Sequence, residues 1–228
     1  MVLLATDSTG TVLPRQRVLL WSPAQKGTSM PKLFYSPASP YSGKVRMAAA
    51  YVGIAVESVT VETGPQPALL TDVNPLGKIP VWITDDGQSI YDSRVITQYL
   101  NRLSGNKLFP RNAEKRLDAE RLEALADGIC DCLLAIVYER RARPEEIVHQ
   151  PWIDKQWTKA TRALDLLNAN PPKLPKAISA GQIALRAAIG YLDLRFAGKW
   201  EKGRPRLKRW AARFDEKFPE LKAIIPQG

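Results

Sequence analysis

The sequence predicts an α+β protein with a mixed N-terminal domain and an all-helical C-terminal domain. Short apolar and β-branched runs alternate with helical patterns in residues 30–105, whereas residues 111–228 show helical periodicity alone. A stretch rich in Gly, Asn and Pro at 105–110 separates the two regions. A chain of 228 residues is long enough for one large or two small domains.

The N-terminal elements are expected in the order βαβ and then ββα. Gly53 ends the first helical pattern where a left-handed C-cap is favoured. Asp85-Asp86-Gly87 is a strong hairpin signal between two short strands. Gly64-Pro65-Gln66-Pro67 opens an irregular stretch. The expected elements are strand 32–35, helix 39–52, strand 56–61, strands 80–84 and 89–90, and helix 92–103.

Four helices are expected in the C-terminal region. The segment Ile183–Phe196 is nearly all apolar, so it should lie at the centre of a helical bundle. Ser179 and Gln182 before it fit a capping box. The expected helices are 113–143, 151–168, 183–196 and 205–217.

Residues 1–29 differ in composition from the rest and are interpreted as an extension outside the fold, with the first domain beginning at Met30. No basic segment precedes the apolar residues at the N-terminus, and no apolar run approaches the ~20 residues that span a bilayer. The expectation is therefore a cytoplasmic protein without membrane contact. Cys130 and Cys132 are two residues apart on an expected helix. This spacing fits neither a CxxC redox motif nor a metal site, so both cysteines are interpreted as structural and no metal is expected.

The positive charge is concentrated in the C-terminal region. The chain carries a net charge of +10, and Arg195–Arg213 holds eight basic residues against Glu201 alone. This stretch is interpreted either as a solvated surface or as a patch that attracts polyanions. No aromatic platform or nucleic-acid motif accompanies it, so no specific nucleic acid is expected.

Ser39 is expected where the first strand turns into the first helix. The first N–H groups of a helix are unpaired and favour negative charge. A serine hydroxyl at this point can donate a hydrogen bond to a bound thiolate, and the helix end lowers the pKa of a thiol by about one unit or more. The thiol would belong to a ligand, because the turn contains no Cys. The alternative is that Ser39 only caps the helix.

Two further motifs fit a peptide ligand. A cis Ile79–Pro80 bond would turn the backbone of Ile79 outward, ready to pair with an extended peptide, whereas an ordinary trans proline on an edge strand is the alternative. Asp92 and Ser93 open a helix. Ser93 could bind a carboxylate and Asp92 an α-amino group, or either could be a simple N-cap. In this order and spacing, the motifs predict a thioredoxin-like domain that binds a small thiol peptide.

From Pro31 onward, the chain resembles the bacterial cytosolic glutathione transferases. The matching segments are FYSPASPYSGKVR, NPLGKIPVW and IYDSRVITQYL, and then EALADGICDCLLAIVYERRARPEE and AGQIALRAAIGYLDLRF in the helical region. The resemblance implies a thioredoxin-like first domain, a helical second domain, glutathione as co-substrate and a homodimer. It also implies that Ser39 is the catalytic residue that activates the glutathione sulfur. Ser36 lies in the same turn, so either serine can be assigned; Ser39 is favoured.

The resemblance assigns the remaining glutathione contacts by position. Ile79, before a cis-Pro80, would pair with the cysteinyl backbone. Asp92 and Ser93 would hold the γ-glutamyl end, and Lys78 would face the glycyl carboxylate.

The second substrate is expected between the domains, beside the helix that contains Tyr138. Tyr138 could donate a hydrogen bond to this substrate, or it could be a packing residue. Arg140 or Arg141 could attract an anionic substrate. His149, the only histidine, is interpreted as solvated surface.

The function expected from these observations is conjugation of glutathione thiolate to small electrophiles. The alternative is a binding module with the same fold and no turnover, which the basic stretch motivates. A glutathione-dependent reductase is disfavoured, because the turn at the helix start lacks a Cys.

Overall fold

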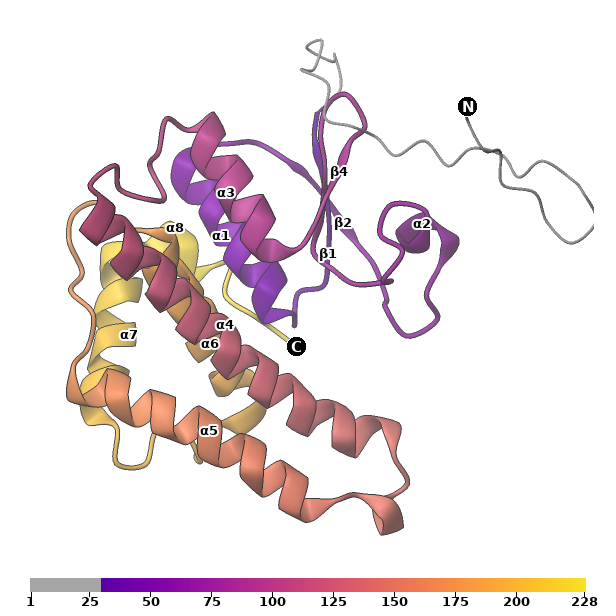
Figure 1. The fold of residues 1–228 in the computed structure, drawn as a ribbon, viewed down its shortest axis with the longest axis vertical. Helices are drawn as coiled ribbons and strands as arrows, with labels where there is room; N and C mark the ends of the chain where they lie inside the picture. The colour runs from indigo at the N-terminus through magenta and orange to yellow at the C-terminus, as the bar shows by residue number, and fades with distance from the viewer. Residues whose placement is uncertain (1–29) are drawn as a thin grey trace, which may run out of the picture.

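The computed structural model describes residues 30–228, so the predicted extension at 1–29 lies outside the described residues. Its N-terminal region contains a thioredoxin-like four-stranded sheet in the order β2-β1-β3-β4. Strands β1 and β2 are parallel, and β3 is antiparallel to both β1 and β4. The elements are β1 (Lys32–Tyr35), α1 (Pro40–Val52), β2 (Glu57–Thr60), α2 (Ala68–Thr71), β3 (Val81–Ile83), β4 (Ser89–Ile90) and α3 (Ser93–Leu103). Helices α1 and α3 lie side by side next to this sheet (Figure 1).

This region confirms the expected βαβ and ββα order, with one addition. The short helix α2 lies in the stretch that was expected to be irregular, and it begins after Pro67. Helix α2 has four residues, which is too short to show helical periodicity in the sequence, so the sequence does not predict it. Gly53 caps α1 in the left-handed conformation, with φ of 78°, as predicted.

The C-terminal region is entirely helical. Its elements are α4 (Ala113–Ala142), the 3₁₀ turn η1 (Glu145–Ile147), α5 (Gln150–Ala169), α6 (Ala180–Phe196), α7 (Pro205–Lys217) and α8 (Pro219–Lys222). Helix α6 is buried along most of its length and packs against α4 and α1. It begins at Ala180, three residues before the expected start, and the predicted capping box is present: the N–H of Ser179 donates to Gln182 Oε1 at 2.8 Å.

The two regions share one hydrophobic core. Leu33 and Val45 of the first region join Leu185 and Ile189 of α6 in the same buried cluster. The segment between the regions is anchored too, since the N–H groups of Leu108 and Phe109 donate to Asn101 Oδ1 at 3.1 and 2.8 Å. The proposed division into domains 30–105 and 111–228 stays a prediction. None of the described helices has the length and apolar character needed to cross a bilayer.

Candidate functional site

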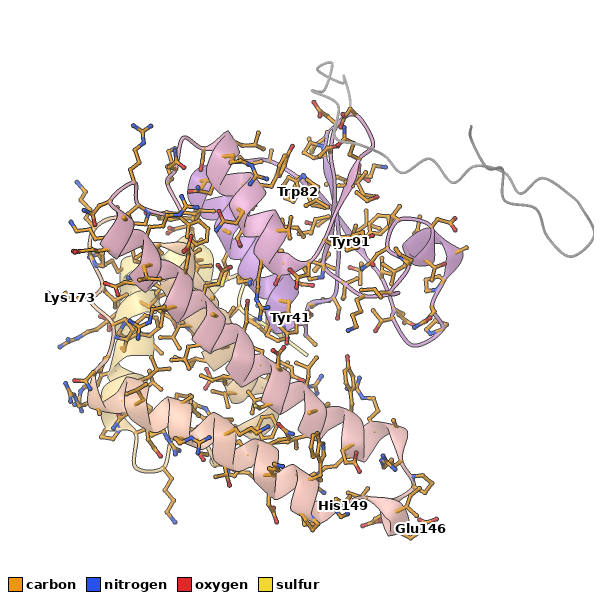
Figure 2. All side chains as sticks on the ribbon, in the orientation of Figure 1. Tyr41, Trp82, Tyr91, Glu146, His149 and Lys173 are labelled. Carbon is orange, nitrogen blue, oxygen red and sulfur yellow. The ribbon has the colours of Figure 1, made fainter. Side chains whose placement is uncertain are left out.

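A cavity of about 830 Å³ lies between the ends of the N-terminal elements and helices α4 and α6. Its walls include Tyr41 and Tyr91, which are labelled in Figure 2. Apart from Arg140, the alternative to Arg141, the site residues assigned from the sequence all line it: Ser36, Ser39, Lys78, Ile79, Pro80, Asp92, Ser93, Tyr138 and Arg141. Residues separated by about a hundred positions in the chain therefore meet around one space.

The turn between β1 and α1 brings Ser36 and Ser39 to the cavity. The N–H of Ser39 donates to the carbonyl of Ser36 at 3.1 Å, which closes the turn. The Ser39 hydroxyl oxygen accepts a hydrogen bond from the N–H of Ser42 at 3.2 Å, so Ser39 is the N-cap of α1. Because this bond uses the oxygen as acceptor, the hydroxyl hydrogen can still be donated to a ligand. Capping and thiolate binding are therefore compatible roles for Ser39.

The loop before β3 presents Ile79 to the cavity. The Ile79–Pro80 peptide bond is cis, as predicted. Asn74 holds the loop from inside: its Nδ2 donates to the carbonyl of Lys78 at 2.7 Å, and its Oδ1 accepts from the N–H of Leu76 at 3.1 Å. Asn74 is not among the residues predicted for the site, although an Asn before Pro in a tight loop is a signal for such bonds.

Asp92 and Ser93 lie at the N-terminus of α3. Asp92 is the N-cap, with its Oδ1 accepting from the N–H of Arg94 at 3.0 Å. Ser93 is the first helical residue and is buried. A ligand carboxylate beside Ser93 would face the positive end of the helix, and the second oxygen of Asp92 can accept from an amino group.

A cluster of charged residues under the cavity was missed by the sequence reasoning. Lys44 of α1 is 1% exposed, and its Nζ lies 2.8 Å from Asp127 and 3.1 Å from Glu123, both on α4. Asp127 also accepts from Arg94 Nε at 2.9 Å. The available signal was the spacing of Glu123, Asp127 and Asp131, which places three carboxylates on one face of α4.

Asp131 continues this row of carboxylates to the cavity wall, where it accepts a hydrogen bond from the Tyr41 hydroxyl. Burial, together with this bond, raises the pKa of Tyr41 far above its ordinary value. Tyr41 therefore stays a neutral hydroxyl at physiological pH and adds no negative charge to the cavity.

Helix α4 supplies the far wall. Tyr138 is half exposed, and the Arg141 guanidinium lies 5.9 Å from the centre of its ring. Arg140, the other arginine considered from the sequence, instead donates to Gln150 Oε1 at 3.1 Å and does not line the cavity. His149 is exposed beside the start of α5, away from Tyr41 (Figure 2), in agreement with its interpretation as a surface residue.

The end of the chain supports the Ser36–Ser39 turn. The N–H of Gln227 donates to the carbonyl of Pro37 at 3.0 Å. Figure 1 shows the C-terminus beside the lower end of α1. No local pattern in the sequence signals this contact, since it joins residues from opposite ends of the described chain.

Comparisons with known proteins agree with this architecture. The family model described as "Glutathione S-transferase, N-terminal domain" matches residues 33–108. The uncharacterized GST-like protein YibF of Escherichia coli K12 is 32% identical over 181 residues, which cover 77% of this chain and 89% of YibF. The chain belongs to the glutathione transferase family.

Solved structures of other family members superpose on most of the chain. A glutathione S-transferase of Methylobacillus flagellatus KT, with GSH bound, is 37% identical with a TM-score of 0.78, covering 86% of this chain and 100% of that one. A glutathione transferase family member of Pseudomonas fluorescens Pf-5, with bound glutathione, is 35% identical with a TM-score of 0.79, covering 87% and 100%. A glutathione S-transferase of Methylobacterium radiotolerans JCM 2831, in complex with glutathione sulfonate, is 30% identical with a TM-score of 0.80, covering 88% and 96%.

Proposed function

We propose that this member of the glutathione transferase family binds glutathione and conjugates its thiolate to small electrophiles. The observation that carries the proposal is the meeting, around one cavity, of Ser39, the backbone beside cis-Pro80, and the helix start at Asp92 and Ser93. These are a hydroxyl donor, an exposed peptide edge and a site for charged termini, which together match a short thiol peptide.

Ser39 is proposed to stabilise the sulfur anion. A free thiol with a pKa near 8.5 is mostly protonated at pH 7. Lowering that pKa by about two units is worth about 2.7 kcal/mol and makes the thiolate the dominant form. The Ser39 hydroxyl and the first turn of α1 supply the donor and the positive end of a helix dipole that such a shift requires.

The remaining groups are proposed to hold and orient glutathione. The Ile79 backbone pairs with the cysteinyl unit, Asp92 and Ser93 hold the γ-glutamyl end, and Lys78 attracts the glycyl carboxylate. Fixing the sulfur beside the second substrate removes much of the entropic cost of bringing two molecules together.

The electrophile is proposed to bind against α4, between Tyr138 and Arg141. With an aryl halide, the sulfur forms a bond to the ring carbon, and the halide departs with the electron pair of the broken bond. The thiol proton passes to solvent. Tyr138 can donate a hydrogen bond to the activated ring, and Arg141 attracts an anionic substituent.

The test is conjugation of an electron-poor aryl chloride by the full chain, followed by absorbance. We expect Ser39→Ala to lower kcat/KM at least about tenfold, because one hydrogen bond to a charged sulfur is lost. The pH midpoint of the rate should rise in this variant. Ser36→Ala is the matched control and should change the rate less than about threefold. Equal rates for wild type and Ser39→Ala would show that Ser39 is wrongly assigned.

Glutathione binding without turnover of any electrophile would instead identify the alternative function, a binding module. A cytoplasmic homodimer is also part of the proposal, on the basis of family resemblance. Light scattering of the purified chain at several concentrations tests the dimer, and a monomeric mass throughout would contradict it.

A further inference from the structure

A second cavity, of about 610 Å³, lies between α7 and the segment 171–174 that joins α5 to α6. It shares no lining residue with the cavity proposed for glutathione. Lys173, which lines it, lies on the opposite side of the view from Tyr91 in Figure 2. Within residues 30–228 its lining holds five cationic side chains and no carboxylate: Lys173, Arg206, Arg209, Arg213 and Lys217.

The walls of this cavity are fixed by hydrogen bonds between α7 and the segment opposite. Trp210 Nε1 donates to the carbonyl of Pro172 at 2.7 Å, and Lys217 Nζ donates to the carbonyl of Leu174 at 2.9 Å. Arg206 donates to the carbonyl of Ala169. These bonds hold two cationic side chains and the loop in place, so the cavity is a built feature of the fold and not a chance gap between mobile chains.

None of the five lining cations forms an ion pair with an acidic residue in the part of the chain that the structure describes. Arg206 and Lys217 bond to backbone carbonyls, which leaves Lys173, Arg209 and Arg213 as the cations available to a ligand. Arg209 and Arg213 are four residues apart on α7, where like charges repel and destabilise a helix. Asp215 is the acidic residue of α7 closest to Arg213 in sequence. Its Oδ1 lies 2.6 Å from Nε of Arg186, so Asp215 is already paired. An external anion is the group that would relieve this repulsion.

We infer that this cavity binds a small oligoanion that carries two or more phosphate groups. Guanidinium groups present a fork of N–H donors that matches phosphate oxygens, and Lys173 adds a flexible ammonium. Trp210 is buried and forms the floor of the cavity with the two prolines, whereas the five cationic side chains are exposed around it and accessible to a ligand. The volume suits a small molecule. This cavity would therefore bind a ligand other than glutathione, and the proposal does not depend on the outcome of the transferase test.

The experiment is calorimetric titration of the full chain with inorganic tripolyphosphate at about 50 mM salt. We expect saturable binding that Arg209→Gln with Arg213→Gln weakens at least about tenfold, and that Lys173→Gln alone weakens about threefold. The matched control is Lys199→Gln with Lys202→Gln, which removes the same charge from an exposed loop outside the cavity. It should weaken binding less than about twofold. Glutathione binding should be equal in all of these variants.

Absence of tripolyphosphate binding would overturn the inference. An equal loss in the control variant would do so as well, because it would show only general attraction to a basic surface. If a single-stranded RNA oligonucleotide binds more tightly than tripolyphosphate, and the Arg209 and Arg213 substitutions abolish that binding, the partner is a nucleic acid and the small-ligand assignment is wrong. Should the double variant not fold, as judged by its melting temperature, Arg213→Lys and Lys173→Gln are titrated separately with tripolyphosphate. Unchanged binding in both single variants would overturn the inference.

Discussion

The buried ammonium of Lys44 on α1 lies 2.8 Å from the Asp127 carboxylate on α4. The same carboxylate accepts from Arg94 at the start of α3, and it forms part of the wall of the proposed glutathione cavity. Glu123 completes the cluster by contacting Lys44 at 3.1 Å and accepting from Thr97 at 2.8 Å. One set of ionic contacts therefore connects α1, α3 and α4 directly beneath the site.

Replacing Lys44 should strongly destabilise the protein. Lys44→Met removes the cation and leaves two carboxylates buried without it, which is expected to lower the free energy of unfolding by about 3–5 kcal/mol. The control is Lys32→Met, because Lys32 contacts Glu57 at 3.5 Å with both side chains about half exposed. That change should cost less than about 1 kcal/mol. Urea unfolding measures both, and a similar small loss in each variant would mean that the buried cluster contributes little.

The cluster should also make stability depend on pH. Burial raises the pKa of Glu123 above its ordinary value of 4.5, with Lys44 and Thr97 acting in the opposite direction. Above pH 4.5 the unfolded chain loses this proton before the folded protein does, so the free energy of unfolding falls as the pH rises through that window.

Glu123→Gln removes this titration, so the stability of the variant relative to wild type should increase from pH 4.5 towards neutrality. Urea unfolding at several pH values measures the difference. Glu120→Gln, a matched change at a more exposed position of α4, is the control. Parallel profiles for wild type and Glu123→Gln would show that another group carries the pH dependence.

Two glycines in the C-terminal helices should respond in opposite ways to the same substitution. A Cβ atom on Gly181 of α6 would lie 2.7 Å from the carbonyl oxygen of Ala119 and 2.8 Å from Leu122 Cβ. Gly181→Ala should therefore lower the free energy of unfolding by about 1–3 kcal/mol, because backbone must move. Around Gly128 of α4 nothing lies within 4 Å of an added Cβ, so Gly128→Ala should stabilise by about 0.5–1 kcal/mol. Thermal unfolding compares the two, and a Gly181→Ala variant as stable as wild type would contradict the assigned packing of α6 on α4.

The neighbouring arginines of α4 offer a matched test of substrate binding. Arg141 lines the cavity, whereas Arg140 is bound to Gln150 outside it. For an electrophile with a carboxylate substituent, Arg141→Ala should raise KM about threefold to tenfold, and Arg140→Ala should leave it unchanged. Steady-state kinetics with a neutral analogue provides the second comparison, since neither substitution should change the KM for that analogue. Equal effects of the two substitutions on the anionic substrate would remove Arg141 from the proposed site.

Much of the fold was predictable because its signals are local. The cap at Ser39, the left-handed Gly53 and the cis bond before Pro80 each depend on a few adjacent residues, and the structure contains all three. Helix α2 was missed because it is too short to show a period. The assigned site residues were found by position within motifs, and the structure brings them to one cavity, although their individual roles stay predictions.

The sequence alone determined the fold class, the order of the elements and the motifs that face the cavity, since local backbone preferences and hydrophobic periodicity specify these features. Only the tertiary structure decided that Arg141 and not Arg140 reaches the cavity, that Lys44 is buried against α4, and that Gln227 supports the turn at Pro37. The physical reason is that these contacts depend on how each helix is rotated and packed against distant parts of the chain. That arrangement is set by the whole core and not by neighbouring residues.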